Sequence, residues 1–305
     1  MASLYSYIKS SITPEGTLPA GFSLPSEETG GLHFADGAQD GIFIYHVQHE
    51  PLSADDIARI GELTALAGAG DNAGAEAGFK DFCKAHRVIS FIDDLQRNVM
   101  NNYATLSANA IFKFAVHLLY DSDDAECVKV GLSFLEMIDI SNDEELKEAV
   151  RTIGLSDEFT IFAVFIMRKW PDAEAKILSL AKKVRGWGRI HCVEFMDAEQ
   201  TDTKRWLLLN GIDNDVVSAY SAWAVYEIAG VEDILKRDLF TKDEIHALIA
   251  LTDALMDEGP VQGISLMDSP ETYLKRILTI TAGKDYLEDF EKDILDNIKN
   301  SLTQQ

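Results

Sequence analysis

The sequence contains few of the residues and segments that define special classes of protein. Its 305 residues include only three cysteines, Cys83, Cys127 and Cys192, and they are far apart. An odd number of isolated cysteines argues against a disulfide framework and favours a reducing, cytoplasmic setting. No apolar run approaches the roughly 20 residues that a membrane-spanning helix needs. The first residues also lack the basic and apolar regions of a signal peptide, so we expect no membrane partner.

Basic residues are scarce as well. The chain has 27 lysines and arginines against 51 aspartates and glutamates, which gives a net charge of −24. A surface with this charge repels phosphate groups, so binding to nucleic acid or to an anionic membrane is disfavoured. The densest basic segment, residues 182–189, is too small to offset the charge of the rest of the chain. The acidic surface therefore favours solubility and, more weakly, a basic partner.

The common motifs of nucleotide-binding and hydrolytic enzymes are also missing. The sequence contains no G-x-x-x-x-G-K-[ST], G-x-G-x-x-G or G-x-S-x-G pattern. It contains neither H-E-x-x-H nor a C-x-x-C pair, which are typical of zinc sites. We therefore expect no cofactor and no metal ion, and we assign no catalytic residue.

Proline and glycine, in contrast, are concentrated in residues 1–53. Four of the seven prolines and six of the 20 glycines lie there. Within this segment, residues 32–34 and 42–45 are β-prone runs, and Asp-Gly steps between them are typical of turns. We expect a short β-hairpin in residues 1–53, packed on a helical domain that covers residues 54–305.

From residue 54 onward, apolar residues recur at helical spacing. Ser53 and Asp56 resemble a capping pair at the start of the first helix. The Ala/Gly-rich segment 68–78 interrupts the pattern, and one long helix is predicted from Phe79 to Met100. Glycines and prolines then separate short helices. These are predicted at 105–119, 124–139, 143–152, 157–169, 172–184, 187–198, 202–209, 214–229, 241–256, 270–281 and 284–301.

Ala108 to Met137 is the clearest helix pair in the chain. It reads as two short amphipathic helices joined by an Asp/Ser turn, which is the unit of a helical-repeat solenoid. Residues 143–169, 172–198 and 202–229 form similar pairs. An irregular helical bundle is the alternative architecture.

The segment LLYDSDDAECVKVGLSFLEMI within this pair resembles a HEAT repeat, with Asp at the turn and Val-Lys at the start of the second helix. Further blocks along the chain are similar to an uncharacterised bacterial family of HEAT-like proteins. They are FADGAQDGIFIYH (34–46), VKVGLSFLE (128–136), GLSDEFTIFAV (154–164), KKVRGWGRIHCVE (182–194) and WLLLNGIDNDVVSAY (206–220). The resemblance implies an all-α, HEAT/armadillo-like α-solenoid of irregular helix pairs. It implies no established activity.

Residues 186–194 are the first group of candidate binding residues. A helix that starts near Trp187 places Trp187, His191 and Glu194 on one face, with Arg189 near the first turn. These side chains have the chemistry of a ligand pocket, in which His191 and Glu194 form a polar pair. The alternative is that Trp187 packs in the core while the polar groups pair inside the protein.

An aromatic group downstream supplies the second set of candidates, Trp206, Tyr220, Trp223 and Glu227. Tyr220, Trp223 and Glu227 share one helical face, and aromatic side chains are frequent anchors of protein interfaces. Aromatic residues at helical spacing also pack in cores. We predict non-enzymatic binding of a protein or peptide on a concave face near residues 187–227. The alternative is an enzyme or small-ligand protein with a pocket around Trp187, Arg189, His191 and Glu194.

Overall fold

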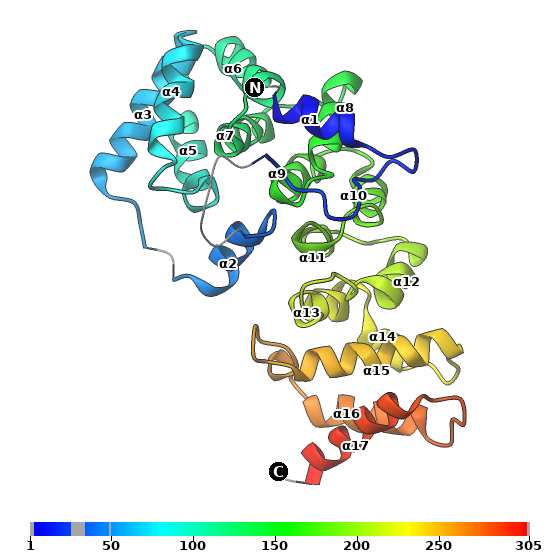
Figure 1. The fold of residues 1–305 in the computed structure, drawn as a ribbon. Helices are drawn as coiled ribbons and strands as arrows, with labels where there is room; N and C mark the ends of the chain where they lie inside the picture. The colour runs from blue at the N-terminus through cyan, green and yellow to red at the C-terminus, as the bar shows by residue number, and fades with distance from the viewer. Residues whose placement is uncertain (1–2, 26–33, 49, 304–305) are drawn as a thin grey trace. The chain divides into compact units, whose positions relative to one another are not determined.

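The computed structural model describes residues 3–25, 34–48 and 50–303 (Figure 1). Within these residues it contains 17 α-helices, one short 3-10 helix and no strand. The prediction of an all-α protein is therefore confirmed. The chain divides into two compact units, Met1–Gly188 (unit 1) and Arg189–Gln305 (unit 2). The predicted boundary between residues 53 and 54 lies within unit 1.

Ten helices lie wholly within unit 1. They are α1 (Leu4–Ser11), α2 (Ala38–His46), α3 (Ala54–Gly68), α4 (Asn72–Phe82), α5 (Val88–Asn102), α6 (Ala108–Asp121), α7 (Ala125–Glu136), α8 (Glu144–Ile153), α9 (Asp157–Met167) and α10 (Ala173–Ala181). The helix α11 (Gly186–Glu194) begins in unit 1 and ends in unit 2.

Helix α7 is the centre of unit 1. It packs against α4, α5, α6 and α9, and every residue from Cys127 to Leu135 is buried. Gly131 permits the close approach of α6, because a Cβ atom there would lie 2.8 Å from the Cβ atom of Leu118. Phe134 meets Phe79 and Phe114, with ring centroids 6.2 and 6.1 Å away. This burial accounts for the nearly continuous apolar sequence of the helix.

Acidic and hydroxyl side chains begin many of the helices. The hydroxyl of Ser53 accepts a hydrogen bond from the Asp56 N–H, which confirms the predicted cap of α3. Asp71, Asp124 and Asp143 accept equivalent bonds at the starts of α4, α7 and α8. Part of the acidic excess thus satisfies backbone N–H groups at helix ends.

The structure contradicts two of the local predictions. Residues 42–45 belong to helix α2, so the strand expected there is wrong; the other half of the expected hairpin lies mostly outside the described residues. The helix expected from Phe79 to Met100 is two helices, α4 and α5, separated at residues 83–87. In both places, contacts between residues distant in the sequence override the local propensity. Arg87, which lies between α4 and α5, forms an ion pair with Asp40 of α2.

Unit 2 is built around helix α15 (Lys242–Met256), which packs against α12, α13, α16 and α17. Thr241 and Glu244 form a complete capping box at its start. The other elements of the unit are α12 (Thr201–Asn210), α13 (Ala219–Ile228), α14 (Val231–Leu235), η1 (Ile264–Leu266), α16 (Pro270–Thr281) and α17 (Asp289–Thr303). Among the described residues of the chain, no helix combines the length and the apolar character that crossing a membrane requires.

Candidate functional site

Trp187 is a packing residue of unit 1. Its side chain is buried and stacks on Tyr45, with ring centroids 6.0 Å apart. Gly41 lies directly against the indole, because a Cβ atom at that position would come within 2.2 Å of the ring. The tryptophan therefore fixes α2 against the start of α11.

The two glycines that flank Trp187 also have a structural explanation. Added Cβ atoms at Gly186 and Gly188 would lie 2.2 and 2.5 Å from the carboxylate oxygens of Asp157. Gly186 has a φ of +54°, a left-handed conformation that favours glycine. The backbone N–H groups of Trp187 and Gly188 donate to Asp157, so this carboxylate caps the start of α11.

Asp157 is an unusual cap because it is partly buried and lies beside other acids. Burial raises the pKa of Asp157 to about 8, against the opposing effect of its backbone hydrogen bonds, and Asp36 and Glu158 raise it further. Burial and Glu158 likewise raise the pKa of Asp36 to about 6. The neutral acid is thus the favoured form of Asp157 near neutral pH.

Arg189, His191 and Glu194 lie in unit 2. Arg189 is 3% exposed and His191 is 1% exposed. The Arg189 Nη1 atom donates to the carbonyl oxygens of Asn210 and Asp213. Its guanidinium group lies 5.3 Å from the ring centroid of Trp206, and His191 Nδ1 lies 3.7 Å from Glu194 Oε2. Such burial is typical of packing residues, and the ligand pocket around them stays a prediction.

The second predicted group lies partly on an open groove in unit 2, which we call the α13–α16 groove. The groove has a volume of about 720 Å³. Its lining includes Trp223, Tyr226 and Glu227 of α13, residues 266–269, and Thr272 and Tyr273 of α16. The structure therefore brings Trp223 and Glu227 together at one surface. Trp206 packs against Arg189 instead, and Tyr220 is not among the lining residues.

Three aromatic side chains form a wall of this groove. Trp223 and Tyr226 are stacked, with centroids 5.2 Å apart and an interplanar angle of 23°. Tyr273 meets Tyr226 edge to face at 5.7 Å, and the Tyr273 hydroxyl is hydrogen-bonded to Thr252 Oγ1 at 2.8 Å. Because Tyr273 is buried and bonded, it holds the wall in position.

Carboxylates surround this aromatic wall. Burial raises the pKa of the Tyr226 hydroxyl, and the charges of Glu232, Asp268 and Glu227 raise it further. No sequence pattern links Asp268 or Tyr273 to α13, since they belong to a loop and a helix that meet α13 only through tertiary packing. The spacing of Tyr220, Trp223 and Glu227 on α13 was the only local signal.

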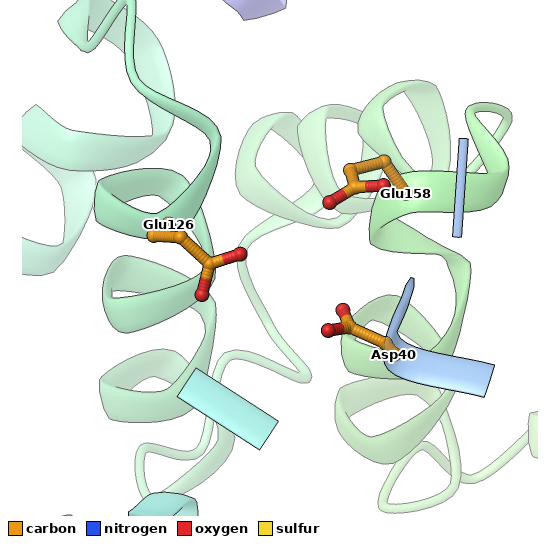
Figure 2. A group of neighbouring side chains, drawn as sticks. All are labelled: Asp40, Glu126 and Glu158. Atoms are coloured by element: carbon orange, nitrogen blue, oxygen red, sulfur yellow. The ribbon is translucent and has the colours of Figure 1, made fainter. Parts of the chain in front are cut away.

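A second group of charged side chains lies inside unit 1, where Asp40 is fully buried and Glu126 and Glu158 are partly buried. Asp40, Glu126 and Glu158 come from α2, α7 and α9, and their carboxylates point toward one another (Figure 2). One oxygen from each lies within 4.8 Å of the others, a spacing that a metal ion could bridge. We call these three residues with Lys129 and Arg87 the buried charge cluster.

Lys129 occupies the space between these carboxylates. Its ammonium group lies 2.6 Å from Asp40, 2.8 Å from Glu126 and 2.5 Å from Glu158. Burial opposes the charge of Lys129, but the carboxylates raise its pKa above the usual value. The cation of the cluster is thus supplied by the chain itself, so we propose no metal site.

Arg87 completes the buried charge cluster. Its Nε atom binds Asp40 at 2.5 Å, and its Nη2 atom lies 3.2 Å from Glu126 and 3.3 Å from Glu158. The backbone N–H groups of Gly37 and Val88 donate to Glu158 and Glu126. Each charge of the cluster therefore has several partners, as burial of charge requires. The cluster fastens α2 to the starts of α5, α7 and α9.

Comparison with known proteins identifies no relative of this chain. No known family matches the chain, and no curated protein or solved structure is significantly similar to it.

Proposed function

We propose that this protein binds a partner protein, that its helix pairs form a HEAT-like scaffold, and that the α13–α16 groove is the contact surface. Consecutive helices pack against each other at α3 and α4, α6 and α7, α8 and α9, and α12 and α13. This pairing agrees with repeat units that each contact mainly their neighbours.

The observation that supports the proposal is the open groove with its aromatic wall. Trp223 and Tyr226 are only partly buried although both are large and amphipathic. Leu266, which lines the same groove, is 42% exposed. Aromatic anchors beside exposed apolar groups are typical of the centre of a protein interface. A groove of this kind accommodates an extended peptide segment better than it accommodates a flat protein surface.

The enzyme or small-ligand alternative has weaker support. It depends on Trp187, Arg189 and His191, and all three side chains are buried. A substrate would need these side chains to reach solvent, so their burial argues against a pocket around them.

Selection of phage-displayed random peptides against the full chain tests the proposed function. Peptides that bind the wild type are expected to lose most of their affinity for Trp223→Ala and Leu266→Ala. Truncation of an interface anchor typically costs about 2 kcal/mol or more, which is roughly thirtyfold in affinity.

The matched controls are Leu239→Ala and Phe290→Ala, which remove exposed apolar side chains of unit 2 outside the groove. Peptides should bind these variants as they bind the wild type. If the selected peptides bind Trp223→Ala and Leu266→Ala with unchanged affinity, the groove is not the contact surface. Circular dichroism of each variant shows that the fold is kept.

A further inference from the structure

We infer that the α13–α16 groove recognises a positively charged side chain, a lysine or an arginine in an extended segment of the partner. This inference rests on the proposed function and adds the chemistry of the residue that is bound. Three features of the groove support it: the aromatic wall, two exposed carboxylates, and local cations that are already engaged.

The aromatic wall offers a surface that attracts cations. Trp223 and Tyr226 stack on each other, and both are only partly buried, so part of their ring surface is open to the groove that they line. The face of an aromatic ring is the negative end of its quadrupole, and tryptophan binds cations best among the aromatic side chains. A lysine or arginine side chain also places its apolar stem against such a wall.

Two carboxylates of the groove are available to a ligand. Glu227 and Asp268 are exposed, and their carboxylates have no hydrogen bond or ion pair with other residues in the described part of the chain. Both lie close enough to Tyr226 to raise the pKa of its hydroxyl, as does Glu232. An incoming cation would thus meet the aromatic wall and these carboxylates together.

The cations that line the groove already have partners. Lys236 binds Asp233 at 2.7 Å and lies 3.9 Å from Glu232. Arg276 donates to the backbone carbonyls of Leu235 and Arg237 at 2.8 and 2.5 Å. Neither is paired with Glu227 or Asp268, so the charge of those carboxylates is left for a ligand.

The start of α16 lies beside the groove, and the dipole of a helix favours anions at that end. Asp268 and Glu271 counter this effect, since one precedes the helix and the other lies in its first turn. The net charge of −24 further repels acidic or phosphorylated segments and attracts basic ones. The local and the overall charge therefore favour the same kind of partner.

Nuclear magnetic resonance of the tryptophan indole N–H groups gives a direct test. The chain has four tryptophans, and Trp223→Phe assigns the signal that reports on the groove. The probes are four peptides, acetyl-Ala-Leu-Xaa-Leu-Ala-amide, in which Xaa is lysine, trimethyllysine, the neutral tert-butyl isostere of trimethyllysine, or glutamate. The isostere keeps the shape of trimethyllysine and removes only its charge.

The lysine and trimethyllysine peptides are expected to shift the Trp223 signal and to bind about three- to tenfold more tightly than the isostere and the glutamate peptide. The double variant Glu227→Gln/Asp268→Asn should reduce this preference at least threefold. The control Asp285→Asn/Asp293→Asn removes two exposed carboxylates of unit 2 outside the groove and should leave the preference unchanged.

Equal binding of the charged peptides and the isostere at Trp223 overturns the inference and leaves the proposed function standing. No shift of Trp223 with millimolar lysine or trimethyllysine peptide also overturns it. Failure of the proposed function gives a different result. In that case the peptides selected by phage display bind Trp223→Ala and Leu266→Ala with the same affinity as the wild type.

Discussion

The buried charge cluster of unit 1 and the α13–α16 groove of unit 2 use similar side chains in opposite ways. In unit 1, the carboxylates of Asp40, Glu126 and Glu158 share the cations of Lys129 and Arg87. In unit 2, the carboxylates of Glu227 and Asp268 are exposed and have no such partner among the described residues. Acids that share cations within the protein hold helices together, whereas acids left unbalanced beside aromatic rings suit a ligand.

Removal of the central cation is expected to have the largest effect on stability. Lys129→Met leaves the buried carboxylate of Asp40 and the partly buried carboxylates of Glu126 and Glu158 with Arg87 alone, and breaking a buried ion pair costs about 3–5 kcal/mol. Urea denaturation followed by circular dichroism measures the loss. Lys113→Met, an exposed lysine on α6, is the control and should change the free energy of unfolding by less than about 0.5 kcal/mol. A loss below about 1 kcal/mol for Lys129→Met would mean that the cluster does not fasten α2.

Gly41→Ala is expected to reduce the stability of the fold measurably, but by less than Lys129→Met does. Its Cβ atom would overlap the Trp187 ring, and overpacking of a core costs about 1–3 kcal/mol. The intrinsic fluorescence of tryptophan and the midpoint of urea unfolding report the change. Gly259→Ala is the matched control because its nearest neighbour, an Asp257 oxygen, lies 3.5 Å away. Equal midpoints for the two variants would show that α2 does not pack tightly on Trp187.

The pH dependence of stability tests the environment of Asp157. Its pKa is raised from 3.8 to about 8 by burial, so the folded state binds this proton more tightly than the unfolded state does. The resulting stabilisation is complete below pH 4 and is lost as the pH rises toward 8. Asp157→Asn stays neutral and should therefore flatten the decline in melting temperature between pH 5 and pH 8. Identical slopes for the variant and the wild type would contradict the raised pKa.

The smallest effect on stability is expected in the groove. Glu227→Gln/Asp268→Asn removes exposed carboxylates, and surface substitutions of this kind usually change stability by less than about 0.5 kcal/mol. Thermal melting of the variant beside the wild type gives the comparison. A large loss of stability would assign these carboxylates a structural role like that of the buried charge cluster.

The sequence predicted most of the helices because their signals are local. Capping residues and glycines mark the ends of α6, α8, α9 and α15 closely. Helix α2 was missed since Ile42 to Tyr45 are β-prone, and its helical form depends on Asp40 and Gly41, whose partners lie more than 40 residues away. The motif around Trp187 was found, but only the structure relates its glycines to Asp157.

The sequence predicted only part of the groove, because it shows local spacing and not tertiary contacts. The aromatic spacing on α13 identified Trp223 and Glu227, which share a helical face. Asp268, Leu266 and Tyr273 belong to segments with no periodic link to α13, so only the packing of unit 2 brings them to the groove.

Titration of the lysine peptide into Glu227→Gln/Asp268→Asn tests the central claim most directly, with Asp285→Asn/Asp293→Asn as the charge-matched control. The account predicts that the affinity measured at the Trp223 indole falls at least threefold in the groove variant and is unchanged in the control. An equal affinity for the two variants would contradict the claim that the unbalanced carboxylates of unit 2 recognise a cationic partner.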